Sequence, residues 1–488
     1  MLGHPKGLYV LFMTEMWERF SFYTMRAILV LYLAGVVFSD LPGGPQVVRD
    51  RALEVYGTYL LLVYLSGLGG GYFADKVLGS RKAIFIGGLV MGAGLFVMMA
   101  PQLVFYGLGL VIAGNGFFKP NISTIVSGLY GEQDSRRDGA FTIFYMGINI
   151  GAFLAIFSAG WAESIGNWNI GFVIAGIGMI VSLFVFGLGQ KHLGTAGFPP
   201  NRTVTVDTRL GSGDFRDIAL WAAGMIGAVL GVVFLWNHGL APLWEMIPGF
   251  VKLAGGILLI IAAFGGFVAT NRDNSREEWE RIISIVILSV FVIFFWAGFE
   301  QAGGTMNLFA YEQTDRHIFG WEMPATWFQG VNPFFIVLLA PLFSMLWGRL
   351  DRSRFPLSTP AKMGVGMIVL GIGFIVMYFG EGVAEQYGKA GMGWLVAVYL
   401  LHTMGELCLS PIGLSMVTKL SPVRRVSLMM GVWFACTAIA DYLSGRLEAI
   451  THAFGINLWA TLIATSIGAG VLLLFLTPML KKWMHGRA

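Results

Sequence analysis

The chain has 488 residues, of which 56% are hydrophobic and only 12% are charged. Soluble globular proteins carry about 25% charged residues, and so apolar a surface would aggregate in water, which excludes a soluble enzyme. Intrinsic disorder is excluded as well, because disordered chains have low hydrophobicity. The net charge of +4 is small, and the basic residues form no stripe that could bind nucleic acid.

The sequence has no motif typical of a cofactor or metal site. The nucleotide-binding pattern G-x-x-x-x-G-K-[ST] is absent. The two cysteines, Cys408 and Cys436, lie in apolar segments and form neither a disulfide framework nor a zinc spacing. We therefore expect neither a cofactor nor a metal.

A helix that crosses a bilayer needs roughly 20 mostly apolar residues. The first such segment, at 7–35, carries four charged residues, so it is a true span and not a cleavable signal peptide. Fourteen segments are predicted to span the membrane: 7–35, 50–74, 82–100, 103–130, 139–163, 169–190, 217–237, 249–270, 282–303, 323–348, 361–379, 391–419, 427–448 and 455–480.

The distribution of Lys and Arg between the loops predicts the orientation. If the N-terminus is cytoplasmic, the loops on the cytoplasmic side hold 23 basic residues and the loops outside hold six. This bias agrees with the positive-inside rule. It predicts that both termini lie in the cytoplasm.

Two polar stretches, 191–216 and 271–281, divide the predicted spans. They predict an N-terminal six-helix bundle over 7–190 and a C-terminal six-helix bundle over 281–480. The linker between them, 191–280, is expected to contain two extra transmembrane helices as an inserted hairpin.

Similar loops, rich in acids and bases, follow the second span at 71–82 and its counterpart in the last bundle at 348–362. Together they resemble the loop signature of the major facilitator superfamily. The resemblance implies an all-α polytopic membrane protein with the major facilitator fold, in which two six-helix bundles surround a central cavity with alternating access.

Seven ionisable residues fall inside the predicted spans. An ionisable group at membrane depth is costly and needs a partner or a wet cavity, so each one marks a candidate functional position. Four acids against three bases indicate mutual pairing and not a simple ion pore, and the alternative is a purely structural ion network. The seven are Glu15, Glu18, Arg19, Arg26, Lys119, Glu300 and Glu406.

The charges of the first span lie on one helix face, which also holds Phe22, and Glu15 can pair with Arg19 four residues later. Lys119 is too central in its span to reach the membrane surface, so it needs an acid nearby or a transported anion. Glu300 and Glu406 are candidate proton sites, because burial disfavours the charged carboxylate and a neighbouring base favours it.

Other polar residues lie near this charged set. Asp441 is expected at the membrane interface, closer to the outer surface. Four more residues either pack in the core or line one polar cavity with the charged set: Tyr64, Tyr145, Asn149 and Asn332.

These residues resemble the proton-dependent oligopeptide transporter (POT) family. Residues 15–23, Glu-Met-Trp-Glu-Arg-Phe-Ser-Phe-Tyr, are similar to the family motif ExxERFxYY, except that Phe22 replaces the first Tyr of its pair and removes one cavity hydroxyl. Residues 144–151 are similar to the fifth-span signature, and 299–301 and 405–411 to the seventh and tenth core helices. The inserted hairpin resembles the two extra helices of bacterial members.

The resemblance implies a transporter and not an enzyme, which carries di- and tripeptides into the cell together with protons. It implies a protein of the plasma (inner) membrane that contacts the lipid bilayer and works as a monomer. Proton coupling is expected from Glu15, Glu18, Arg19 and Glu300. Peptide binding is expected from Arg26, Lys119, Tyr23, Tyr64, Tyr145, Asn149, Trp296, Glu300, Asn332, Glu406 and Trp433.

The resemblance also implies gates at the two ends of the cavity. Lys119 is expected to pair with Glu406 across the bundles and close the inner side. At the outer side, Arg49 or Arg51 is expected to meet Glu312.

A zwitterionic peptide suits these residues, because the bases of the first bundle and Glu300 of the second can hold its two ends. Protonation of Glu300 is expected to release Arg26, which then binds the peptide carboxylate. Three alternatives stay open: a proton-coupled carrier of the same fold for nitrate, nucleosides or drug-like solutes, a membrane enzyme, and a channel. An enzyme would need a clustered catalytic set, and the seven His residues are scattered.

Overall fold

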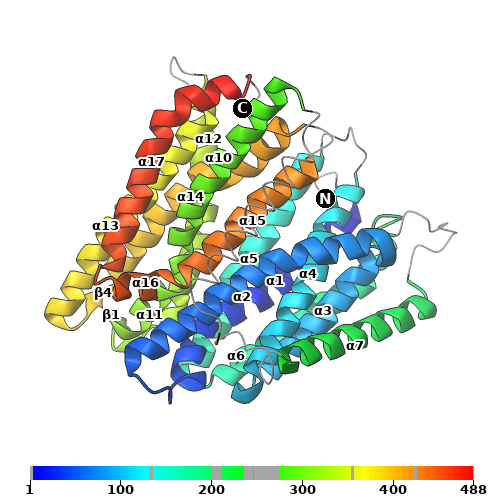
Figure 1. Cartoon of the computed structure of the whole chain (residues 1–488). Helices are drawn as coiled ribbons and strands as arrows, with labels where there is room; N and C mark the ends of the chain where they lie inside the picture. Colours follow the sequence, from blue (N-terminus) through cyan, green and yellow to red (C-terminus); the bar gives the residue numbers. More distant parts are fainter. Residues whose placement is uncertain are drawn as a thin grey trace.

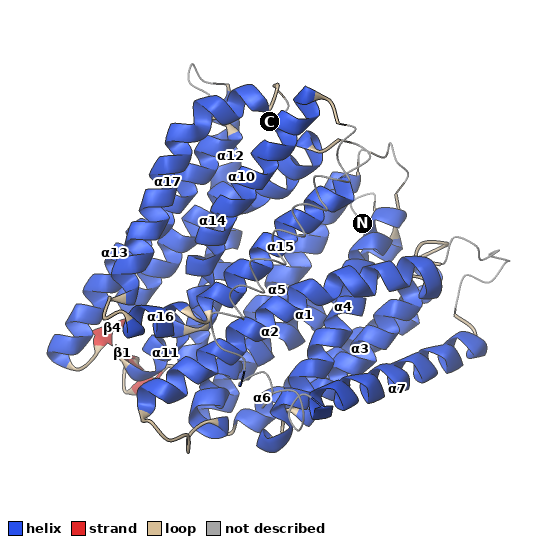
Figure 2. Ribbon diagram, in the orientation of Figure 1, coloured by secondary structure: helices blue, strands red, loops and turns tan. Residues whose placement is uncertain are grey.

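The structure is a computed structural model that describes residues 4–130, 134, 136–198, 210–235, 246, 274–352, 357–422 and 426–486. Figure 2 shows that this part of the chain is almost entirely helical, with short strands near one end of the molecule. Twelve helical segments among the described residues are long and apolar enough to cross a membrane. The predicted all-α membrane fold is confirmed, and the predicted span 249–270 lies outside the described residues.

The helices form two groups, which are arranged side by side in Figure 1. We call the first group the N-terminal bundle: α1 (Lys6–Tyr32), α2 (Pro45–Phe73), α3 (Ser80–Val97), α4 (Val104–Gly128), α5 (Arg137–Ser164) and α6 (Trp168–Gly189). We call the second the C-terminal bundle: α10 (Arg276–Phe299), α11 (Thr305–Glu312), α12 (Val331–Asp351), α13 (Thr359–Tyr387), α14 (Met392–Leu420), α15 (Val426–Ser444), α16 (Leu447–Ala453) and α17 (Leu458–Trp483). Each group has its own core of buried apolar side chains.

Polar side chains mark where the apolar runs become helices. Ser275 and Glu278 form a reciprocal capping box at the start of α10, in which the Ser275 hydroxyl accepts from the Glu278 amide at 3.2 Å. The Asn457 side chain accepts from the Ala460 amide at the start of α17. Helix α13 ends before Gly388, whose φ of 85° is a left-handed conformation that favours glycine.

Short elements join the long helices at one end of the molecule. Two 3-10 turns, η6 (Glu300–Gly303) and η7 (Ala325–Gly330), follow α10 and precede α12. Four two-residue strands lie nearby: β1 (Thr314–Asp315) pairs in parallel with β4 (Ala390–Gly391), and β2 (His317–Ile318) pairs antiparallel with β3 (Trp321–Glu322).

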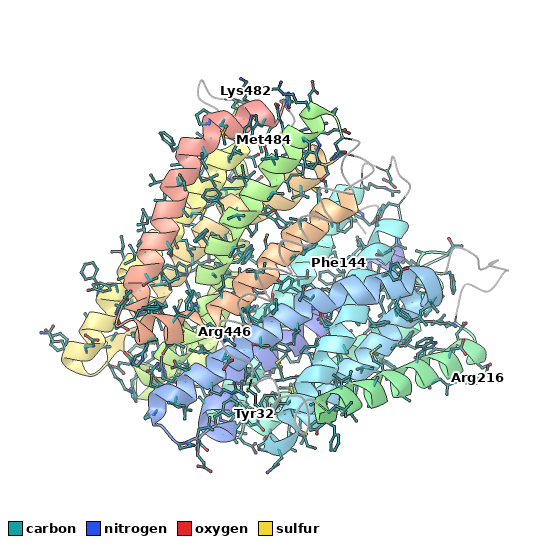
Figure 3. The ribbon with its side chains drawn as sticks, viewed as in Figure 1. Tyr32, Phe144, Arg216, Arg446, Lys482 and Met484 are labelled. Atoms are coloured by element: carbon teal, nitrogen blue, oxygen red, sulfur yellow. The ribbon has the colours of Figure 1, made fainter. Side chains whose placement is uncertain are left out.

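The two bundles meet at the end formed by residues 38–45, 313–324 and 445–457, which we call the closed end. Toward the opposite end, which carries both termini, the bundle axes splay apart (Figure 1), and we call it the splayed end. Helices α2 and α15 pack closely across the bundles, since a Cβ on Gly57 would lie 2.9 Å from the carbonyl oxygen of Asp441. Figure 3 places Arg446 where these two helices meet.

Helix α7 (Ser212–Leu235) is the first helix of the predicted inserted hairpin, and it lies against α3 and α4 of the N-terminal bundle. The Lys82 ammonium forms ion pairs with two acids in the first turns of α7, Asp214 at 3.0 Å and Asp217 at 2.8 Å. Most of its apolar side chains are exposed, which suits a helix that faces lipid.

Candidate functional site

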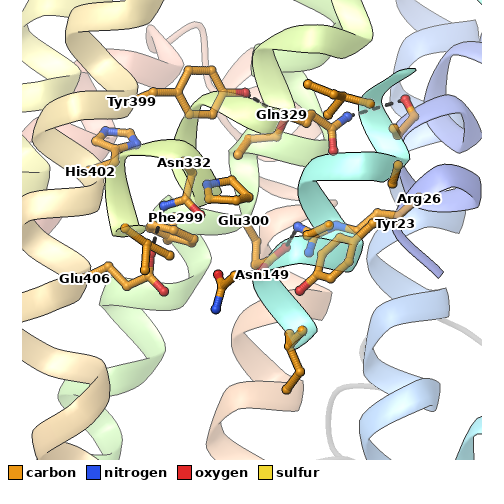
Figure 4. A pocket seen from close by; sticks show the side chains of 18 of the residues that line it. Tyr23, Arg26, Asn149, Phe299, Glu300, Gln329, Asn332, Tyr399, His402 and Glu406 are labelled. Atoms are coloured by element: carbon orange, nitrogen blue, oxygen red, sulfur yellow. Dashed lines mark hydrogen bonds and ion pairs between the residues drawn. The ribbon is translucent and has the colours of Figure 1, made fainter. Parts of the chain in front are cut away.

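A cavity with an empty volume of ≈1030 Å³, part of it open solvent, lies between the two bundles. Its walls come from α1, α2 and α5 of the N-terminal bundle and from α10, η6, η7, α12 and α14 of the C-terminal bundle. Figure 4 shows polar side chains of both bundles directed into the same space. Nine of the residues predicted to bind peptide line it: Tyr23, Arg26, Tyr64, Tyr145, Asn149, Trp296, Glu300, Asn332 and Glu406.

Arg26 and Glu300 form an ion pair across the bundles, at the centre of Figure 4. The Arg26 Nη2 donates to Glu300, and its Nε donates to the Tyr56 hydroxyl at 2.8 Å. Both side chains are nearly buried, with exposed fractions of 14% and 10%. The bridge therefore joins the bundles in a setting where charge attraction is strong, and it occupies the base that a peptide carboxylate would need.

The first helix carries a separate cluster of charges inside the N-terminal bundle. Arg19 lies 3.3 Å from Glu15, and its Nε and Nη2 donate to the two Glu18 oxygens at 2.5 and 2.6 Å. All three residues are buried, and one Glu15 oxygen has no hydrogen-bond partner among the described residues. The predicted pairing of Glu15 with Arg19 is present, and Arg19 is shared between two acids.

Lys119 and Glu406 do not form the predicted ion pair in this conformation. The Lys119 Nζ lies over the Tyr64 ring, 4.8 Å from its centroid, inside the N-terminal bundle. Glu406 accepts a hydrogen bond from Asn332 at 2.9 Å, inside the C-terminal bundle. Each group is held by its own bundle, and the pair stays a prediction for the opposite conformation.

Two aromatic residues singled out from the sequence lie outside the cavity. Trp433, predicted to bind peptide, is buried and packs so closely on Gly413 that a Cβ there would meet its ring at 2.4 Å. Phe22 is directed toward Arg19, with 4.8 Å between the guanidinium carbon and the ring centroid, and it stacks near Tyr59. The hydroxyl that Phe22 lacks would therefore belong to the charge cluster of the first helix and not to the cavity wall.

The prediction left open whether Arg49 or Arg51 meets Glu312. Arg49 forms this ion pair across the bundles, whereas Arg51 lies 2.8 Å from Glu54 on its own helix. Arg49 also contacts Glu448 of α16 at 3.0 Å. A second bridge between the bundles joins Glu54 to Arg446 at 2.5 Å.

A further bridge at the closed end was missed in the sequence. Glu163, at the end of α5, accepts from Arg316 at 3.0 Å and from the amides of Ala325 and Thr326 at 2.7 and 3.0 Å. Both charged side chains are buried, with exposed fractions of 6% and 7%. Glu163 is the last residue of the predicted span 139–163 and Arg316 lies in a loop between spans, so membrane depth gave no reason to single them out.

Three polar residues of the cavity were also missed: Gln329, Tyr399 and His402. Tyr399 and His402 lie at helical spacing before Glu406, so the sequence did carry a signal that they share its face. Figure 4 shows all three in the same cavity as Asn332 and Glu406. Asp441, expected at the membrane interface near the outer surface, is buried within the protein, with 1% exposed, where α15 packs against α2. Its depth in the membrane stays a prediction.

The charges of the cavity can hold an anionic and a cationic group at the same time. Within the described residues no group of three or more His, Cys, Asp and Glu side chains could hold a metal ion. The aromatic rings Tyr23, Tyr64 and Trp296 offer apolar surface between the charged ends. The geometry suits a small zwitterion with variable side chains.

Comparison with known proteins identifies related chains. The family model described as "POT family" matches residues 81–462. The chain is 36% identical to "Peptide transporter YePEPT" of Yersinia enterocolitica, over 98% of this chain and 95% of the relative. It is 32% identical to a "Di-/tripeptide transporter" of Lactococcus lactis, over 99% of this chain and 97% of the relative.

A solved structure is similar over the whole chain. It is a mutant of "peptide transporter POT" in complex with alafosfalin, with a TM-score of 0.81 and 35% identity. The alignment covers 100% of this chain and 97% of the solved one.

Proposed function

The chain belongs to the POT family of membrane transporters, and from this membership we propose that it carries di- and tripeptides into the cell together with protons. The names of the relatives from Yersinia enterocolitica and Lactococcus lactis support the substrate class. The observation that carries the proposal is the Arg26–Glu300 bridge, which joins the bundles in the wall of the central cavity.

The two ends of a peptide fit groups of opposite charge in this cavity. We assign the peptide carboxylate to Arg26, with Lys119 nearby on the same bundle, and the amine to Glu300 with Asn149 and Asn332. Tyr23, Tyr64, Tyr145 and Trp296 then surround the peptide side chains, and aromatic surfaces accept many side chains without requiring one. Nitrate has no group for the acidic side of this arrangement, so the zwitterion is the better fit.

A proton and a peptide act on the two partners of the same bridge. When Glu300 takes up a proton it loses its charge, and the bridge to Arg26 weakens. The peptide carboxylate then takes the place of Glu300 on Arg26. Release of the proton to the inner side restores the bridge and returns the empty carrier, so each ligand shifts one equilibrium between two states.

The buried cluster of Glu15, Glu18 and Arg19 is proposed to support proton coupling inside the N-terminal bundle. Arg19 neutralises only part of the charge of two acids, so one acid can carry a proton at modest cost. In the opposite conformation, Lys119 is proposed to leave Tyr64 and meet Glu406 at the splayed end. This exchange would close the inner side while the closed end opens.

The setting of the protein follows the same reasoning. We propose that it lies in the plasma (inner) membrane with both termini in the cytoplasm, that residues 7–190 and 281–480 move as two bundles, and that 191–280 links them. A monomer is sufficient, because one chain supplies both sides of the cavity.

The direct test is uptake of a labelled dipeptide into liposomes that contain the purified protein, with and without an inward proton gradient. We expect accumulation only with the gradient, and competition by unlabelled dialanine. Uptake of nitrate, a nucleoside or a drug-like solute without competition by dialanine would instead assign the carrier to another substrate. Flux without proton dependence would contradict the symport mechanism.

A further inference from the structure

Asp441 is a buried acid that the mechanism above does not use. It lies near the end of α15, with an exposed fraction of 1%. Its Oδ2 is buried without a hydrogen-bond partner among the described residues, and no base among them lies within ion-pair distance of its carboxylate. The carbonyl oxygen of Asp441 accepts from the Ser444 hydroxyl at 2.7 Å, so the backbone is satisfied while the carboxyl is not.

The position of Asp441 is an interface between the bundles. Its helix packs against α2 of the N-terminal bundle, where Gly57 and Gly445 allow the two backbones to touch. One turn further on, the Ser444 carbonyl accepts from Gln301 at 3.0 Å, and Arg446 bridges to Glu54. The packing of α15 on α2 and the Arg446–Glu54 pair cross the bundles, so opening of the closed end is expected to expose the Asp441 side chain.

Charged and titratable groups face Asp441 from several elements. Glu300 on η6, Arg26 on α1 and Lys119 on α4 are close enough to act on it electrostatically. Helix α2 presents the hydroxyl groups of Tyr56 and Tyr64. On the neighbouring α14, the carboxylate Glu406 is bonded to Asn332. Helix α15 itself carries the Tyr442 hydroxyl, and Arg446 follows two residues after its end.

The bases in this set are already committed. Arg26 donates to Glu300 and Tyr56, and Lys119 lies over the Tyr64 ring. A second negative charge beside Glu300, buried and without a hydrogen bond at Oδ2, would cost several kcal/mol by its desolvation alone. The carboxyl avoids this cost by binding one proton, which leaves a neutral acid with no other bond made or broken.

We propose that Asp441 is a second proton-binding site of the transport cycle, which fills when the closed end closes and empties into water when it opens. The site is distinct from Glu300, because Glu300 is paired with Arg26 in the closed conformation whereas Asp441 is not. It follows that acid favours closure of this end even before a peptide binds. The inference rests on alternating access as proposed above, but it needs no peptide.

The test measures closure of this end as a function of pH. Spin labels are placed on Ser39→Cys and Tyr387→Cys, which are exposed residues of the two bundles at the closed end, in a chain that also carries Cys408→Ala and Cys436→Ala. The distance distribution gives the ratio of closed to open molecules in peptide-free nanodiscs between pH 5 and 9. One proton bound on closure changes this ratio by at most about tenfold per pH unit.

Asp441→Asn has the same shape and no charge, so we expect a larger closed fraction at alkaline pH than in the parent. The ratio of closed to open molecules should also vary less steeply with pH, by up to about tenfold per pH unit. Asp441→Glu keeps a titratable carboxyl and should keep the slope. The matched control is Glu381→Gln, because Glu381 is bonded to Asn457 and Trp459 within one bundle. Its slope should equal that of the parent.

The proposal also requires independence from Glu300. In a Glu300→Gln background the effect of Asp441→Asn should persist and add to that of the first substitution. Three results would each overturn the inference. The pH dependence of the closed-to-open ratio could be unchanged in Asp441→Asn, it could be lost equally in Asp441→Glu, or the effect of Asp441→Asn could vanish in the Glu300→Gln background. The measurement contains no peptide. A protein that fails to carry peptides would therefore refute the proposed function, but the pH dependence of closure would still test the role of Asp441.

Discussion

Arg26 makes two kinds of contact at once, donating through Nη2 to Glu300 and through Nε to the Tyr56 hydroxyl. A lysine has the same charge but only one donor group at its tip, so it cannot hold both partners in a fixed geometry. We predict that Arg26→Lys raises the KM for a dipeptide by about tenfold, which corresponds to roughly 1.4 kcal/mol. Initial uptake rates over a range of dipeptide concentrations check this, and an unchanged KM would show that charge alone is sufficient.

Phe22 departs from the family motif, yet its ring lies beside Arg19 and Tyr59 and outside the cavity wall. We therefore predict that Phe22→Tyr changes the KM for dipeptides by no more than about twofold, as substitutions remote from a site usually do. The matched variant Tyr23→Phe removes a hydroxyl from the cavity wall and should raise the KM more. A gain of about tenfold in affinity for Phe22→Tyr would return this residue to the substrate site.

At the scale of elements, α5 is fastened to η7 by one side chain. The Glu163 carboxylate accepts from Arg316 and from two backbone amides that begin η7, so opening of the closed end must break all three bonds. We predict that Glu163→Ala raises the free energy of the closed conformation relative to the open one by about 3 kcal/mol, because it leaves a buried cation with fewer partners. The fraction of open molecules, measured with the spin labels described above, should rise.

The control for the Glu163–Arg316 interaction is Glu322→Gln. Glu322 also contacts Arg316, at 2.8 Å, but half of its side chain is exposed. Exposed ion pairs contribute about 0–1 kcal/mol, so the open fraction should hardly change. Equal effects of the two substitutions would argue against a special role for Glu163.

The elements themselves were largely predictable, because a span of about 20 apolar residues has few other structures available in a bilayer. The second predicted span began at 50, whereas α2 begins at Pro45, since amphipathic turns outside the lipid continue a helix without an apolar signal. The charges within spans were also predictable, because their cost in lipid makes them conspicuous. Glu163 and Arg316 show the opposite case, since a charge at a helix end or in a loop is ordinary until the fold buries it.

At the scale of the whole molecule, the sequence cannot state which of two conformations is adopted. The Arg49–Glu312 pair is formed in this structure, whereas the Lys119–Glu406 pair, which we predict for the opposite conformation, is not. The burial of Asp441 was not predictable for the same reason, because it depends on how α15 meets α2 and not on the local sequence. Pairing within one helix, as for Glu15 and Arg19, was predictable from spacing alone.

The same view explains why one residue can couple two ligands. Each bundle has its own apolar core, so the bundles are expected to move as bodies, and only the bridges between them differ in the two states. Arg26–Glu300 is the bridge that lies in the cavity wall, where a peptide can reach it. A proton on Glu300 and a carboxylate on Arg26 therefore both weaken this bridge and shift the equilibrium between the two arrangements of the bundles.

The most direct measurement compares two kinds of peptide flux in liposomes that contain Glu300→Gln. The neutral side chain imitates a permanently protonated Glu300, so we predict that labelled dipeptide still exchanges with unlabelled dipeptide inside. Accumulation driven by an inward proton gradient should fall to the level seen without a gradient. Accumulation equal to that of the parent protein would contradict the claim that a proton on Glu300 frees Arg26 for the peptide carboxylate.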